Sequence, residues 1–109
     1  MADSSVVGNF VTVARLGDVP PGTARQVTVN DRWVGLFNLD GAYHAVDNLC
    51  LHRGGPLCDG AIKGTVVTCP WHGWQFDVTS GALMQDPTVG VSRHEARVVG
   101  DEIQVRLTD

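Results

Sequence analysis

Hydrophobic residues along this chain fall in short runs, and several of the runs alternate with polar residues. In "ARQVTVN", residues 24–30, Val27 and Val29 are two positions apart, and near the end Ile103, Val105 and Leu107 repeat that spacing. Alternation with a period of two is typical of a strand that buries one face. No window keeps a helical period over ten residues or more. We therefore predict an all-β fold of short antiparallel strands, forming a small sandwich or barrel.

Turn residues separate these runs at intervals typical of hairpins. The segment Pro20–Gly22 ends the run "NFVTVARL", Asn30-Asp31 precedes "RWVGLFNL", and Asp40-Gly41 precedes "AYHAV". Asp-Gly between two strand-like runs is a strong signal for a two-residue hairpin loop. Gly100-Asp101 predicts one more turn inside the C-terminal run "EARVVGDEIQVRL".

The middle of the chain has a different character from the ends. Residues 47–60 and 69–90 are rich in Gly and Pro, with the strand-like segments "GTVVTCP" and "WQFDVTSG" between and beside them. Loops carry function when a rigid scaffold positions them. We expect one domain over residues 1–109, in which a β-frame carries a loop-rich lobe at about residues 47–90.

Length and charge exclude some functions. The chain has 109 residues, a formal net charge of −4, and 8 Lys and Arg residues of which no two are adjacent. A sequence with this charge and spacing lacks the basic patch that nucleic-acid binding needs. The N-terminal "MADSSVVGNF" has no basic start followed by an apolar core, and no apolar run is long enough to span a bilayer. We therefore expect a cytoplasmic protein that binds neither nucleic acid nor membrane.

Two loops each contain one cysteine and one histidine at short spacing, Cys50-x-His52 and Cys69-x-x-His72. In a reducing compartment, cysteine near histidine indicates a metal site before it indicates a disulfide. Three interpretations remain open: buried thiols or a disulfide with incidental histidines, a structural zinc site, and a [2Fe–2S] cluster with two histidine ligands. The third cysteine, Cys58, fits neither pair, and we do not count it as a ligand.

The segments "CLHRGG" and "CPWHGWQFD" resemble the two ligand boxes of Rieske iron–sulfur proteins, C-x-H and C-x-x-H. The flanking "RGGPL", the "FDVTSG" hairpin and the tail "ARVVGDEIQVRL" are also similar to that family, and the resemblance extends from about Val34 onward. It implies an all-β domain of Rieske type with one [2Fe–2S] cluster. Carried over by position, Cys50 and Cys69 would hold the inner iron, and His52 and His72 would hold the outer iron near the surface.

The resemblance also implies a function. Neutral imidazole ligands raise the reduction potential from about −400 mV, typical of plant-type ferredoxins, to roughly −150 to +300 mV. We expect an electron carrier and not an enzyme, which passes electrons from a flavin-dependent ferredoxin reductase to the terminal oxygenase of an aromatic-ring dioxygenase system. The alternatives are the small subunit of an assimilatory NADH nitrite reductase and, in another class, a zinc-stabilised interaction module. A terminal oxygenase would need a large catalytic domain after Asp109.

High-potential members of the family differ from this sequence beside both boxes. They carry an extra cysteine in each box, where this chain has Gly55 and Trp71, and a Ser and a Tyr after the second box, where it has Trp74 and Phe76. Fewer hydroxyl hydrogen bonds to sulfur lower the potential, so we expect a value at the low end of the Rieske range.

The remaining candidates have weaker signals. Leu51, Pro56, Trp71 and Trp74 could form an apolar collar around the centre. Residues 84–92 resemble the proline-bearing loop that covers the cluster, with Pro87 as its anchor. We expect His44 and His94 to be ordinary exposed or half-exposed histidines.

Overall fold

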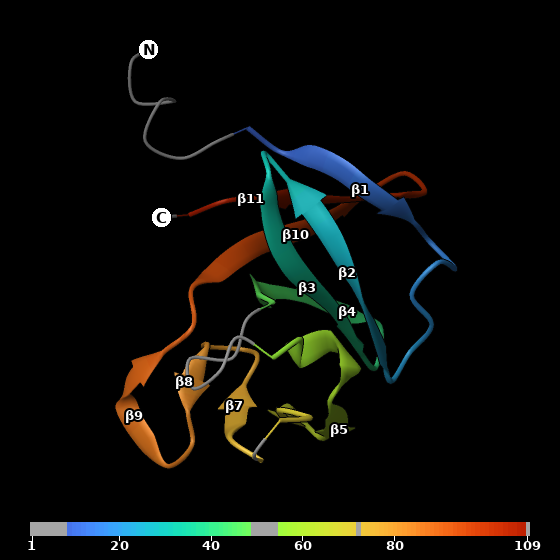
Figure 1. The fold of residues 1–109 in the computed structure, drawn as a ribbon. Coiled ribbons are helices and arrows are strands. Elements are labelled where there is room, and N and C mark those ends of the chain that lie inside the picture. Colours follow the sequence, from blue (N-terminus) through green and yellow to red (C-terminus); the bar gives the residue numbers. More distant parts are fainter. Residues whose placement is uncertain (1–8, 49–54, 72, 109) are drawn as a thin grey trace.

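The computed structural model describes residues 9–48, 55–71 and 73–108, and in these ranges all the regular elements but one short 3-10 helix are strands (Figure 1). The elements, in chain order, are β1 (Val11–Arg15), β2 (Thr23–Val29), β3 (Arg32–Leu39), β4 (Ala42–Asp47), the short 3-10 helix η2 (Leu57–Asp59), β5 (Ala61–Lys63), β6 (Val66–Thr68), β7 (Gln75–Asp77), β8 (Ala82–Leu83), β9 (Asp86–Gly90), β10 (Arg93–Val99) and β11 (Glu102–Arg106). The predicted all-β class is confirmed.

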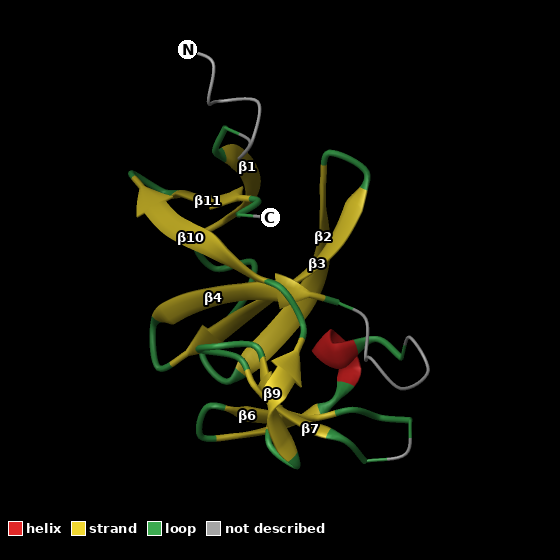
Figure 2. Ribbon diagram, turned by 90° about the vertical axis from the view of Figure 1, so that its left-hand side faces the viewer, coloured by secondary structure: helices red, strands yellow, loops and turns green. Residues whose placement is uncertain are grey.

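The strands form two antiparallel sheets. The larger has the order β1-β11-β10-β4-β3-β2 and contains both ends of the described chain, and its edge strands β1 and β2 also contact one another. The smaller has the order β5-β6-β7-β8-β9 and comes from the chain between β4 and β10. Figure 2 shows the smaller sheet and η2 below the larger sheet. The middle of the chain thus forms its own sheet, and it contains more strand than its loop-rich composition indicated.

The predicted turns between β2 and β3 and between β3 and β4 are both confirmed. Asn30 and Asp31 have φ values of 49° and 67°, and Asp40 and Gly41 have 55° and 92°. Two consecutive residues with positive φ match the right-handed twist of the flanking strands. The β2–β3 pairing then runs without interruption from Thr23 opposite Asn38 to Val29 opposite Arg32.

Both faces of the central strands β3 and β4 are buried. Leu36 and Ala45 belong to the core inside the larger sheet, whereas their neighbours Phe37 and Val46 belong to a second core beneath it. Because successive side chains of a strand point to opposite faces, one strand can contribute to two cores. The second core also contains Cys69. The candidate site therefore rests directly on the central strands.

Candidate metal centre

The second Cys/His box lies on the hairpin between β6 and β7. Cys69 follows the last residue of β6, and its N–H donates to the carbonyl oxygen of Trp74 at 2.7 Å, across the turn. Gly73 has a φ of 78°, a left-handed conformation that favours glycine. His72, the second predicted ligand of this box, lies outside the described residues. The hairpin thus fixes Cys69 by main-chain hydrogen bonds at the start of a tight turn.

The side chain of Cys69 is almost completely buried, with 2% of the residue exposed, in the core that also holds Leu57, Val67 and Phe76. Its Sγ accepts a hydrogen bond from the N–H of Trp71 at 3.4 Å. An amide N–H directed at sulfur favours an electron-rich sulfur, as in a thiolate bound to a metal. The environment of Cys69 therefore fits a cluster ligand.

The first box, with Cys50 and His52, lies outside the described residues, but the residues that flank it are described. Gly55 is buried, and a Cβ at this position would lie 3.0 Å from Cys69 Sγ and 3.0 Å from Cδ2 of Trp71. At Gly55, the main chain that follows the first box in sequence therefore lies close to the sulfur of the second box. The sequence alone did not identify Cys69 and Trp71 as the neighbours of Gly55.

Gly60 makes a second close approach between the same two segments. A Cβ on Gly60 would lie 2.0 Å from the carbonyl oxygen of Thr68, the residue before Cys69. No side chain larger than hydrogen fits there. Glycines at both positions thus bring the segment after the first box against the second box. Among the described residues, no group of three or more His, Cys, Asp or Glu side chains is placed to hold a metal ion.

The chain matches the model of the Rieske [2Fe-2S] domain over residues 9–100. It belongs to the Rieske [2Fe-2S] domain family. The family's cofactor is one Rieske-type [2Fe–2S] cluster, and the donor set of two thiols and two imidazoles in the two boxes has the composition that this cluster requires. No helix in the described part of this Rieske chain is long and apolar enough to cross a membrane.

Relatives of this Rieske protein include electron carriers of oxygenase systems. The ferredoxin component of the naphthalene 1,2-dioxygenase/salicylate 5-hydroxylase systems of a Ralstonia species is 29% identical over 91% of this chain and 96% of its own length. A chain in the solved complex of reduced oxygenase and oxidised ferredoxin in carbazole 1,9a-dioxygenase is 27% identical, with a TM-score of 0.81 over 92% of this chain and 94% of that one. A Mycobacterium tuberculosis protein assigned as the small subunit of an NADH-dependent nitrite reductase is 30% identical, with a TM-score of 0.83 over 90% of this chain and 94% of that one.

Two tryptophans and a proline of the expected apolar collar lie within the described part of the Rieske domain. Trp71 is half-exposed, at 49%, and its ring lies against Gly55. Trp74 is partly buried and packs against the core that holds Cys69, and Pro56 is also partly buried. Leu51 lies outside the described residues, so the complete collar remains a prediction.

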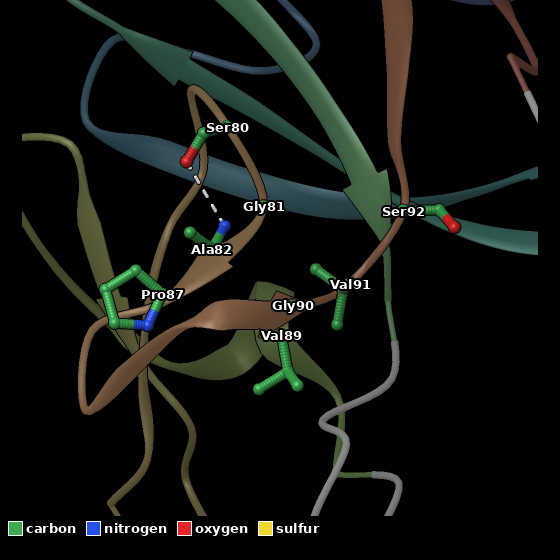
Figure 3. A pocket seen from close by; sticks show the side chains of 8 residues that line it. All are labelled: Ser80, Gly81, Ala82, Pro87, Val89, Gly90, Val91 and Ser92. Atoms are coloured by element: carbon green, nitrogen blue, oxygen red, sulfur yellow. Dashed lines mark hydrogen bonds between the residues drawn. The ribbon is translucent and has the colours of Figure 1, made fainter.

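The segment expected to cover the cluster forms β9 instead of a loop. Figure 3 shows Pro87 on this strand, beside a pocket of about 280 Å³ that β8, β9 and their flanking residues line. No lining residue is ionisable, and the hydrogen bond drawn runs from the N–H of Ala82 to Ser80 Oγ at 3.2 Å. The lining therefore offers two serine hydroxyls and no acid, base or thiol, and the role of Pro87 as an anchor remains a prediction.

His94 corrects an expectation from the sequence. It was expected to be exposed or half-exposed, but it is 1% exposed. The Thr108 N–H donates to His94 Nδ1 at 3.2 Å, so Nε2 carries the ring proton and donates to Asp47 Oδ1 at 2.8 Å. Asp47 Oδ2 in turn accepts a hydrogen bond from Arg32 at 3.0 Å. This network fixes Asp47 at the end of β4, where the chain enters the first box.

His44 is partly buried, in agreement with the expectation from the sequence. Burial lowers its pKa, and the positive charge of Arg93 lowers it further, whereas Asp77 opposes both effects. Cys58 is also partly buried, and burial raises the pKa of its thiol, so this thiol stays protonated at neutral pH. A protonated thiol is a poor metal ligand, which agrees with leaving Cys58 out of the ligand set.

Proposed function

We propose that this chain is the ferredoxin component of a multicomponent oxygenase system acting on aromatic compounds. In this role residues 1–109 form one domain that carries single electrons from a flavin-dependent ferredoxin reductase to a terminal oxygenase in the cytoplasm. The family assignment and the relatives from dioxygenase systems support the proposal. As an electron carrier, the protein is not itself an enzyme.

In this proposal, Cys50 and Cys69 would hold one iron of the cluster, and His52 and His72 would hold the other. The observation that carries it is the close approach of Gly55 to Cys69, where an added Cβ would lie 3.0 Å from Sγ, since this places the flank of one Cys/His box beside the cysteine of the other. When bound, the cluster supplies a reversible one-electron store. The chain buries the sulfur of Cys69 away from water and directs the Trp71 N–H toward it.

The residues after the second box bear on the reduction potential. Phe76 is completely buried in the same core as Cys69 and has no hydroxyl group, and Trp74 can offer only an indole N–H. Hydrogen bonds to cluster or ligand sulfur favour the reduced state, so their absence lowers the potential. We infer a potential at the low end of the roughly −150 to +300 mV range of Rieske centres.

The proposal is tested by measuring the iron and sulfide content of the protein and its ability to transfer electrons to an oxygenase. Purified protein should contain iron and acid-labile sulfide in equal amounts, and the EPR spectrum of the reduced form should indicate histidine ligation. It should then support oxygenation of an aromatic substrate when combined with a reductase and a terminal oxygenase from a naphthalene or carbazole dioxygenase system. Protein that contains zinc without iron or sulfide would instead establish the zinc-stabilised module.

The small subunit of an NADH nitrite reductase remains the second candidate, because the Mycobacterium tuberculosis protein is as similar as the ferredoxins. The two roles differ in the partner. A nitrite reductase subunit should bind a large reductase subunit and raise its rate of NADH-dependent nitrite reduction. A ferredoxin should instead shuttle between two partners and support turnover when present at less than stoichiometric amounts.

A further inference from the structure

The two ends of the segment that contains the first Cys/His box are joined by one side chain. Asn48 follows β4 and is completely buried, and its Oδ1 accepts the N–H of Cys58 at 2.7 Å. Its Nδ2 donates to Cys58 Sγ at 3.2 Å. Asn48 and Cys58, which stand before and after Cys50 and His52 in the sequence, are therefore joined directly, and we call this junction the Asn48–Cys58 clamp.

The larger sheet is shaped to hold the Asn48 side chain. Nδ2 also donates to Gln26 Oε1 at 2.8 Å, from β2. On β3, opposite Gln26, lies Gly35, where a Cβ would be 3.0 Å from Asn48 Oδ1. The main-chain N–H of Asn48 donates to the carbonyl of Trp33 at 3.1 Å. Each polar group of the buried carboxamide thus has a partner, which fixes its orientation.

The far end of the clamp is anchored independently of Asn48. Cys58 lies in η2, whose neighbouring residue Leu57 is completely buried in the core that holds Cys69. The 3-10 helix packs against β2 and β3. The amide of Asn48 therefore joins the end of β4 to η2, and each of these elements is already fixed to the fold. It sets the distance between the two points of the chain that flank the first box in the sequence.

We propose that Asn48 is a positioning residue for the cluster. By accepting the N–H of Cys58, it fixes the separation of the two chain points that flank Cys50 and His52 in the sequence, and so positions these two residues as ligands. The inference rests on the proposed function, since it assumes that these two residues are ligands. It also gives the Cys58 position a role, because its main-chain N–H completes the clamp. Groups that orient metal ligands typically change metal affinity by roughly 10–100-fold when removed.

The test compares Asn48→Ala with a matched control, Asn38→Ala. Asn38 is also a buried asparagine, with 3% exposed, and it also joins two main-chain segments, through the carbonyl of Val19 at 2.7 Å and the N–H of Gly41 at 2.7 Å. It lies on β3 and contacts neither box through these bonds. Asn38→Ala loses two side-chain hydrogen bonds and Asn48→Ala loses three, of which only those to Cys58 close the clamp.

The measurements are made on protein purified with its cluster. Loss of visible absorbance after addition of an iron chelator gives the rate of cluster release, EPR of the reduced protein gives the g values, and thermal unfolding gives the stability. We expect Asn48→Ala to release iron roughly 10-fold faster than wild type and to shift the g values. We expect Asn38→Ala to lower the unfolding temperature while its g values stay at those of wild type.

Further variants keep the test decisive if Asn48→Ala does not fold. Gln26 is exposed, so Gln26→Ala is expected to fold, and because it removes one partner of the carboxamide it should change release in the same direction by a smaller factor. Cys58→Ala keeps the main-chain N–H and should release iron at close to the wild-type rate.

Two results would overturn the inference. In the first, Asn48→Ala and Asn38→Ala lose similar stability, release the cluster at the same rate and keep the wild-type g values. Asn48 would then have a structural role only. The other is an effect of Cys58→Ala as large as that of Asn48→Ala, which would assign the clamp to the thiol. Wild-type protein without iron and sulfide would instead overturn the proposed function, and the inference with it.

Discussion

Replacing Gly55 by alanine tests whether contact between the two boxes holds the site together. The new Cβ would lie 3.0 Å from Cys69 Sγ and from Cγ and Cδ2 of Trp71, whereas carbon atoms pack best at about 3.5–4.0 Å. Overpacking of this kind costs about 1–3 kcal/mol. Gly55 does not have a positive φ, so alanine also restricts the unfolded chain and returns about 0.4–1 kcal/mol. The net loss is about 0–2.6 kcal/mol, with a midpoint of about 1.3 kcal/mol.

The three contacts of the added methyl group differ in how easily they can relax. Trp71 is half-exposed and its ring can move outward, whereas Cys69 Sγ is buried and can move only by shifting a proposed ligand. A loss of about 1 kcal/mol lowers the unfolding temperature of a domain of this size by roughly 4–8 °C. We therefore expect a modest fall in unfolding temperature together with a disproportionate increase in the rate of cluster release.

A double variant separates the two contacts. In Trp71→Ala the ring is absent, so adding Gly55→Ala to it should cost less stability than Gly55→Ala costs in wild type, because only the contact with Cys69 Sγ remains. Cluster release should stay fast in the double variant for the same reason. Thermal unfolding by circular dichroism and absorbance decay with a chelator measure both quantities. Gly55→Ala protein as stable as wild type and with the same release rate would refute the reasoning.

Three further predictions concern residues around the site. Phe76→Tyr adds a hydroxyl group to the core that holds Cys69, and a redox titration should find a higher midpoint than in wild type; an unchanged midpoint would contradict the inferred cause of the low potential. His94→Leu leaves the N–H of Thr108 and one oxygen of Asp47 without their present partner. Urea unfolding should show that the free energy of unfolding falls by about 1–3 kcal/mol, and an unchanged value would contradict this prediction. Because burial and Arg93 lower the folded pKa of His44 below 6.5, the unfolded chain binds the proton more readily and wild-type stability should fall as the pH decreases from 6.5 through the folded pKa. His44→Gln should flatten that part of the pH profile of the unfolding free energy, and an identical slope in both proteins would disprove this contribution.

Local patterns predicted the frame of the fold well. Alternation placed Val27 and Val29 on one face, and both are buried, because period-two burial follows from strand geometry alone. The turn at Asp40-Gly41 followed from the backbone preferences of two residues. The short strands of the smaller lobe were harder to predict, because β5, β6 and β7 have three residues each, too few for a periodic signal.

Long-range contacts account for what the sequence could not indicate. The burial of His94 depends on Asp47, which is 47 positions away in the chain. The role of Asn48 depends on Gln26 and Gly35 in neighbouring strands. A polar residue in such a place has the sequence signature of an ordinary loop residue, since only the tertiary structure supplies its partners. The Cys/His spacing could be recognised because it lies within each segment.

The structure holds the two boxes by different means, and this difference has a consequence. The second box is part of the β6–β7 hairpin, where the Cys69 N–H bonds to the carbonyl of Trp74 as a continuation of the strand pairing. The described residues that flank the first box are joined by the carboxamide of Asn48, and Gly55 lies close to the second box. Changes in the hairpin should therefore reduce folding and cluster binding together, since the same hydrogen bonds serve both. Changes in the clamp should reduce cluster binding first, because β2, β3, β4 and η2 keep their own cores when the carboxamide is removed.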